Sequence, residues 1–272
     1  MSLASLRNNL QPDGPVLDIH VHPLNCFGTF KPSSPKEDAK ILIARAERSG
    51  ITKMCVFSLY ETTPYEPTPE QCQWANNYVL SMRDVEPDKI IPFCYVTPAF
   101  PHEAVMEIER CVGNHGMLGI KLWVARRAKD INLDLIMEAA IAYDVPVLQH
   151  AWLKSMGNLA GESTPFDVAD LARRHPKSKI IMAHLNGVGY RGIEALVNLP
   201  NVVVDTSGGD PESGILEVAI KRLGAKRIVY GSDAPIRHFG VMINKILGAE
   251  IRKTDKQSIL WNNALRILNI DH

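Results

Sequence analysis

The sequence of 272 residues has no excess of charge of either sign, because 30 Lys and Arg side chains balance 30 Asp and Glu side chains. A general nucleic-acid binder carries a surplus of basic residues, and an anionic membrane surface attracts the same surplus. Long apolar runs are also missing. Runs such as Ile51–Leu59 are far too short to span a bilayer, which takes about 20 residues. We therefore expect neither nucleic acid nor a membrane as a partner.

The sequence also has little that is typical of an exported protein. Residues 1–14 contain no apolar stretch of the signal-peptide kind, and the five cysteines form no C-x-x-C pair. Because Cys55 and Cys94 lie inside apolar runs, we interpret the thiols as buried and reduced. We predict a cytoplasmic location.

Hydrophobic residues make up 46% of the chain, which is enough for a sizeable core. They occur in short runs that alternate with longer amphipathic stretches. The short runs predict strands at Val16–Val21, Thr52–Leu59, Ile90–Val96, Met117–Trp123, Val145–His150, Lys179–His184, Val202–Thr206 and Arg227–Ser232. The amphipathic stretches predict helices at Pro35–Ser49, Pro69–Arg83, His102–Val112, Leu133–Tyr143, Pro165–Arg174, Gly192–Leu199, Pro211–Leu223 and Gln257–Leu268.

Eight apolar strands that alternate with helices favour a closed (β/α)₈ barrel, the TIM barrel of the α/β class. An open doubly wound sheet is the alternative. That fold usually carries a glycine-rich turn after its first strand, and the sequence there is His22-Pro23-Leu24-Asn25. We see no linker, and we predict a single barrel domain over residues 1–272 with residues 1–15 as an N-terminal tail.

Reactive side chains gather at the predicted C-terminal ends of the strands, where barrel enzymes carry their sites. His20 and His22 are two residues apart on the first strand, so they face the same side and can contact one metal ion. Val21 and Ile19 are expected to face the surrounding helices. A lone H-x-H pattern is weak evidence, since two hydrogen-bonded histidines at a strand end are common.

His150 and His184 end the fifth and sixth strands, and Asp233 follows the eighth. Taken singly, each has an ordinary explanation as a hydrogen-bonded core or turn residue. Four imidazoles gathered on one rim would be costly to bury unless something satisfied their polar atoms, and a divalent cation does so. Asp233 adds an oxygen ligand and can accept a proton from a metal-bound water.

Lys121 alternates with apolar residues in the fourth strand, where an unpaired charge is expensive. Three interpretations are open. Lys121 pairs with Asp233 or another carboxylate, or it holds an anionic substrate. In the third, burial lowers its pKa so that the amine takes up carbon dioxide and the carbamate bridges two metals.

Charged and aromatic residues that follow the strands are candidates for binding a flat or carboxylated small molecule. They are Trp123, Arg126, Trp152, Lys154 and Arg237. Further polar residues at strand ends are expected to support the metal ligands through hydrogen bonds. They are Asn186, Asp205 and Ser207, with Asp18 deeper in the first strand as structural support.

The whole set resembles the amidohydrolase superfamily: H-x-H on strand one, Lys on strand four, His on strands five and six, Asp on strand eight. It is most similar to the branch that includes aminocarboxymuconate semialdehyde decarboxylase and pyrone dicarboxylate lactonase. The resemblance extends from Asp18 to Asp233 and the helix that follows. Two positions depart from it, since Trp123 stands where many relatives have His and Ala234 where an aromatic residue is frequent.

The resemblance implies a ligand set and roles. The metal ligands would be His20, His22, His150 and Asp233. His184 would bind a second metal or polarise the substrate, and Lys121 matches the carboxylated lysine of two-metal members.

We predict from this a metal-dependent hydrolase. A metal-activated water attacks a small ester, lactone or amide, with Asp233 as general base. Zinc is the expected ion, with one or two bound, and manganese is the alternative. One rival function is a mononuclear non-oxidative decarboxylase of a small carboxylated substrate. A rival of another class is a barrel that binds metal and ligand without turnover. A homo-oligomer is compatible with the sequence.

Overall fold

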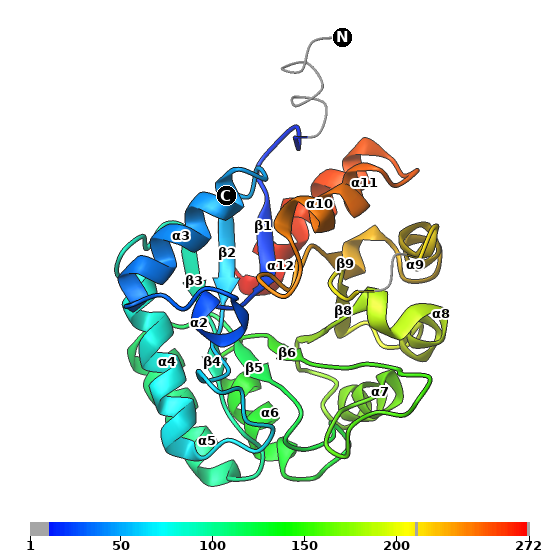
Figure 1. The fold of residues 1–272 in the computed structure, drawn as a ribbon. Helices are drawn as coiled ribbons and strands as arrows, with labels where there is room; N and C mark the ends of the chain where they lie inside the picture. The colour runs from blue at the N-terminus through cyan, green and yellow to red at the C-terminus, as the bar shows by residue number, and fades with distance from the viewer. Residues whose placement is uncertain (1–10, 210–211, 271–272) are drawn as a thin grey trace.

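The computed structural model describes residues 11–209 and 212–270, in which parallel strands form a closed ring surrounded by helices (Figure 1). Neighbouring strands follow the order β1-β2-β3 and then β4-β5-β6-β7-β8-β9. The strands are β1 (Leu17–Val21), β2 (Lys53–Val56), β3 (Ile90–Pro92), β4 (Cys94–Tyr95), β5 (Ile120–Leu122), β6 (Val147–Gln149), β7 (Ile180–Met182), β8 (Val202–Asp205) and β9 (Ile228–Val229).

Hydrogen bonds at two seams close the ring. Between β3 and β4, Phe93 N donates to Val56 O at 2.9 Å, so the predicted strand Ile90–Val96 is two short pieces that share one position in the barrel. Between the last strand and the first, Ile19 N donates to Tyr230 O at 2.9 Å. The predicted (β/α)₈ barrel is therefore confirmed.

The helices follow the strands in chain order. They are α2 (Leu24–Phe27), α3 (Pro35–Glu47), α4 (Pro69–Arg83), α5 (Pro101–Ile108), α6 (Leu133–Ala142), α7 (Pro165–Arg174), α8 (Leu185–Leu196), α9 (Ile215–Leu223), α10 (Phe239–Leu247), α11 (Lys253–Gln257) and α12 (Asn263–Leu268). Short π-helical segments, η1 (Glu109–Asn114) and η3 (Ser258–Asn262), follow α5 and α11, and a 3₁₀ turn, η2 (Ala225–Arg227), precedes β9. Helices α2 and α10 are absent from the sequence prediction, and α11 overlaps a predicted helix only at Gln257.

Helix α8 differs most from its predicted range. It begins at Leu185 rather than Gly192, and its backbone departs from helical angles at Asn186 and Gly189. Glycine is a poor helix former, so the glycines near the start of α8 weaken the helical pattern there. The predicted helix therefore begins too late. The predicted helix Pro211–Leu223 is observed as α9, and its first residue lies outside the described part of the chain.

The apolar core has an outer cluster between strands and helices and an inner cluster that includes the barrel interior. Val21 belongs to the outer cluster, as expected. Ile19, expected to face the helices, packs in the inner cluster with Phe57 and Leu148. The reason is a shift of register in β1 between Asp18 and Val21.

The five cysteines are buried and form no disulfide, as expected. Across residues 11–209 and 212–270, no helix has the length and apolarity needed to cross a membrane. Residues 1–10 of the predicted tail lie outside the described part, and the single-domain assignment stays a prediction.

Candidate functional site

A pocket of about 290 Å³ opens at the carboxyl ends of the strands. The six predicted metal and catalytic residues line it: His20, His22, Lys121, His150, His184 and Asp233. Four predicted substrate-binding residues line it as well: Trp123, Trp152, Lys154 and Arg237. Arg126 is not among the lining residues, because its guanidinium pairs with Glu66 at 2.8 Å on the surface.

His20 in β1 and His22 directly after it both turn toward the carboxylate that follows β9. Nε2 of His20 and Nε2 of His22 each lie 3.4 Å from Asp233 Oδ1. Their outer nitrogens have partners of their own. His20 Nδ1 lies 2.7 Å from Asp205 Oδ2, and His22 Nδ1 lies 3.2 Å from Phe57 O. With the N–H directed outward, each ring presents its Nε2 lone pair to the pocket.

The histidines that follow β6 and β7 adjoin this pair. His184 Nδ1 lies 2.5 Å from Ser207 Oγ, and its Nε2 lies 3.1 Å from His150 Nδ1. The ring centroids of His20 and His184 are 5.0 Å apart. Four imidazoles at the ends of three strands therefore lie side by side in the pocket.

This arrangement fits a single divalent cation. One ligand atom each from His20, His184 and Asp233 can be chosen so that all three lie within 4.8 Å of one another. His22 and His150 adjoin them through the contacts above. Imidazole nitrogens with a carboxylate oxygen form a ligand set suited to Zn²⁺ or Mn²⁺. Either His150 or His184 completes a set with His20, His22 and Asp233.

Burial keeps these imidazoles neutral. It lowers the pKa of His20 and His184 well below the usual histidine value, and it lowers the pKa of His22 and His150 in spite of the carboxylates beside them. A metal-binding histidine must be neutral, so the folded chain holds all four rings in the form that a cation needs.

Lys121 on β5 is 1% exposed, and its Nζ lies 4.6 Å from the centroid of the Phe57 ring. Burial lowers the pKa of its ammonium group to about 7, although the negative charges of Asp205 and Asp233 oppose this. Near neutral pH, Lys121 therefore supplies a positive charge to the pocket only part of the time.

Asp233 is held in place by the backbone of β1. Its N–H donates to His20 O at 2.8 Å, and its φ of 62° lies in the left-handed region, which aspartate adopts more readily than most residues. Asp18 Oδ1 accepts from His20 N at 3.1 Å and from Ser232 N at 2.9 Å. Asp18 thus ties the end of β1 to the segment before Asp233, the supporting position expected from the sequence.

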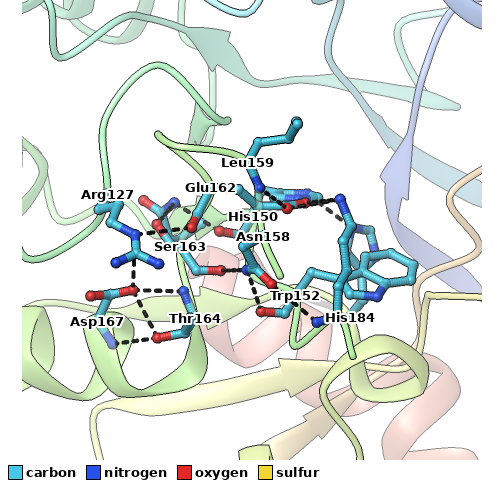
Figure 2. A network of polar contacts seen from close by, with 12 residues as sticks. Arg127, His150, Trp152, Asn158, Leu159, Glu162, Ser163, Thr164, Asp167 and His184 are labelled. Carbon is cyan, nitrogen blue, oxygen red and sulfur yellow. Dashed lines mark hydrogen bonds and ion pairs between the residues drawn. The ribbon is translucent and has the colours of Figure 1, made fainter. Parts of the chain in front are cut away.

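Glu162 lines the pocket but was not singled out in the sequence (Figure 2). This carboxylate, 2% exposed, lies in the loop between β6 and α7, with Oε1 2.9 Å from His150 Nε2. Burial raises the pKa of Glu162, but hydrogen bonds from His150 and Lys154 outweigh that effect and lower it to about 2. A glutamate in an irregular loop gives no periodic signal, so no sequence pattern could identify it.

A family model of amidohydrolases matches residues 18–270. The chain belongs to the amidohydrolase family. The superfamily expected from the sequence is therefore confirmed. One relative of this amidohydrolase is the gamma-resorcylate decarboxylase of Polaromonas sp., which is 22% identical over a match that covers 74% of this chain and 77% of the relative.

Two solved structures share the barrel. The 2,6-dihydroxybenzoate decarboxylase from Rhizobium has a TM-score of 0.74 and 17% identity, over 95% of this chain and 99% of that one. A dihydroxybenzoic acid decarboxylase from Polaromonas sp., solved with manganese and the inhibitor 2-nitroresorcinol, has a TM-score of 0.73 and 18% identity, over 94% and 97% of the two chains. At these identities, the likeness establishes the fold.

The comparisons overturn one prediction. The predicted hydrolysis of an ester, lactone or amide is wrong, because these relatives of the amidohydrolase are decarboxylases. Hydrolysis requires that the ion activates a water molecule. A set of imidazole and carboxylate ligands can equally hold a substrate carboxylate, and the ligands alone do not distinguish the two uses.

Proposed function

We propose that this amidohydrolase is a divalent-metal-dependent, non-oxidative decarboxylase of a small aromatic acid. One observation carries the proposal: ligand atoms of His20, His184 and Asp233 lie within 4.8 Å of one another, in a pocket that His22, His150 and two tryptophans also line. The activities of the relatives support the same reaction class.

Four residues would hold the ion: His20, His22, His150 and Asp233, the set that the resemblance to the superfamily implies. Mixed nitrogen and oxygen ligation suits manganese or zinc, and the manganese in the Polaromonas structure favours manganese. When bound, the ion supplies positive charge that attracts the acidic substrate and stabilises negative charge that develops on it. One such ion needs no bridging carbamate, so we assign Lys121 the role of a cationic partner for the substrate.

Aromatic and basic side chains provide the rest of the binding site. The ring of Trp152 lies 5.0 Å from that of His184, and the ring of Trp123 lies 5.3 Å from that of Tyr65, centroid to centroid. These surfaces suit a flat ring. Arg237 also lines the pocket, and its buried Nε has no hydrogen-bond partner within residues 11–209 and 212–270. Arg237 is therefore available to an anionic group of the substrate.

The reaction breaks the bond between the ring carbon and its carboxyl group. Carbon dioxide leaves, the electron pair stays on the ring carbon, and that carbon takes up a proton. Among the titratable groups that line the pocket, we assign transfer of the proton to Asp233 and His184, because Ser207 orients His184 with Nε2 toward the pocket. We assign His184 to the substrate and leave it outside the ligand set.

Release of carbon dioxide tests the proposal. Protein loaded with Mn²⁺ or Zn²⁺ is incubated with 2,6-dihydroxybenzoate and a panel of hydroxylated benzoates, and headspace carbon dioxide and the decarboxylated phenol are measured. We expect metal-dependent release from at least one acid and none from the Asp233→Asn variant. Bound metal with no release from any acid would contradict the proposal and favour a barrel that binds without turnover.

A further inference from the structure

Glu162 is fixed in the pocket wall by contacts that leave it little freedom (Figure 2). Its Oε2 accepts from Lys154 Nζ at 2.7 Å and from Leu159 N at 3.1 Å, and its Oε1 accepts from Lys154 Nζ at 2.9 Å. The next residue, Ser163, is fully buried, and its Oγ accepts from Ala128 N at 2.9 Å. Hydrogen bonds from Lys154 and Leu159, together with the buried neighbour Ser163, therefore fix the Glu162 carboxylate beside His150.

The loop that carries Glu162 approaches the chain after β5 very closely. A Cβ at Gly161 would lie 1.9 Å from Val124 O, so only glycine permits this path. Asn158 Nδ2 donates to Trp152 O at 2.7 Å and to Ser163 O at 3.2 Å, which ties the two ends of the loop together. The position of the carboxylate is therefore a property of the folded loop.

His150 is oriented differently from the other three histidines. In His20, His22 and His184 the outer partner contacts Nδ1, so Nε2 faces the pocket. In His150, Glu162 contacts Nε2, so Nδ1 faces the pocket, 3.1 Å from His184 Nε2. A neutral imidazole has one N–H and one lone pair, and an ionised carboxylate can only accept. The contact with Glu162 therefore selects the tautomer of His150 that carries its proton on Nε2.

We propose that Glu162 is a positioning residue that holds His150 as the Nε2–H tautomer, with its Nδ1 lone pair directed at the cation site. The inference rests on the proposed function in so far as His150 is a metal ligand. Lys154 keeps the carboxylate in place by binding both of its oxygens. The alternative is an ion pair that only stabilises the loop.

The Glu162→Gln variant separates these two roles. An amide cannot accept at both positions. We expect its oxygen to face the donors Lys154 and Leu159, because Lys154 is charged, and its amino group to face His150. When the amino group faces His150, the ring must accept at Nε2 and carry its proton on Nδ1, which blocks the lone pair that faces the cation site. A residue that only stabilises the loop would change neither the tautomer nor the affinity for metal.

Two measurements test the proposal. Two-bond ¹H–¹⁵N spectra of histidine rings in the metal-free protein report the tautomer of His150, assigned with His150→Asn. Competition with a chromophoric chelator gives the dissociation constant for Zn²⁺. We expect wild-type His150 to be protonated on Nε2, and Glu162→Gln to populate the other tautomer and weaken Zn²⁺ binding by about 10- to 100-fold.

Two control variants sharpen the result. Lys154→Met removes one donor to Glu162 but leaves its carboxylate and the hydrogen bond from Leu159 N, so we expect His150 to stay protonated on Nε2. Glu194→Gln removes a surface carboxylate that pairs with Arg222 at 2.5 Å, and it should alter neither measurement.

Three results would overturn the proposal: wild-type His150 protonated on Nδ1, a Glu162→Gln variant with an unchanged tautomer, or one with unchanged Zn²⁺ affinity. If Glu162→Gln fails to fold, the wild-type spectrum decides. Failure of the proposed function looks different, because wild-type protein would then bind no divalent metal or release no carbon dioxide while the tautomer remains measurable.

Discussion

His20 and Asp205 are separated by 185 positions in the sequence, yet His20 Nδ1 lies 2.7 Å from Asp205 Oδ2. Asp205 is fully buried and also accepts from Ser207 N at 2.9 Å. Ser207 Oγ in turn lies 2.5 Å from His184 Nδ1. Asp205 and Ser207, at the end of β8, therefore orient the imidazoles of His20 and His184 through hydrogen bonds.

This relationship predicts the effect of Asp205→Asn. The amide can present its amino group to His20 and so reverse the tautomer of that ring. We expect metal affinity to fall by about 10- to 100-fold, measured by competition with a chelator. Asp170→Asn, which removes a surface partner of Arg174 on α7, should leave the affinity unchanged. An Asp205→Asn protein that binds metal as tightly as wild type would contradict the role of β8.

Arg237 and Arg126 form a matched pair for substrate binding. Arg237 lines the pocket, whereas Arg126 pairs with Glu66 on the surface. A hydrogen bond to a charged group contributes about 1.5–3 kcal/mol, so Arg237→Gln should raise KM for an acidic substrate by about tenfold or more. Steady-state kinetics should show no such rise for Arg126→Gln. Equal effects in the two variants would remove Arg237 from the binding site.

Gly161 has a steric role that substitution can test. In Gly161→Ala the new methyl group would meet Val124 O at 1.9 Å, so the loop that carries Glu162 must move. We expect a loss of about 1–3 kcal/mol in unfolding free energy together with weaker metal binding. Gly116→Ala is the comparison. Its Cβ would meet no atom within 4 Å, but its φ is +68°, so it should lose stability while metal affinity is retained.

Lys121 predicts how stability changes with pH. Burial lowers its pKa from 10.5 to about 7, so between these values the unfolded chain binds more protons than the folded chain. The contribution of Lys121 to the free energy of unfolding therefore rises with pH between these two pKa values, by up to about 1.4 kcal/mol per pH unit. Urea unfolding of the metal-free protein at pH 7.5 and 8.5 should show this gain, and Lys121→Met should lose it. Equal slopes in the two proteins would mean that Lys121 is not buried as a neutral amine.

The sequence was sufficient for the barrel and for the residues at its strand ends. Alternation of apolar runs with amphipathic stretches determines the fold, and strand ends such as that of His150 then fall on one rim. Three features depend on the path of the chain in space and have no local signature. They are the shift of register that turns Ile19 inward, the surface pairing of Arg126, and the loop that brings Glu162 to His150.

The central claim is that residues at the ends of β1 and β6 and in the chain after β9 bind one divalent cation. Anomalous diffraction at the manganese edge from crystals of Mn²⁺-loaded protein measures this directly. The account predicts one strong peak bonded to Nε2 of His20 and His22, to Nδ1 of His150 and to the Asp233 carboxylate. No peak in the pocket, or a peak bonded to other residues, would contradict it.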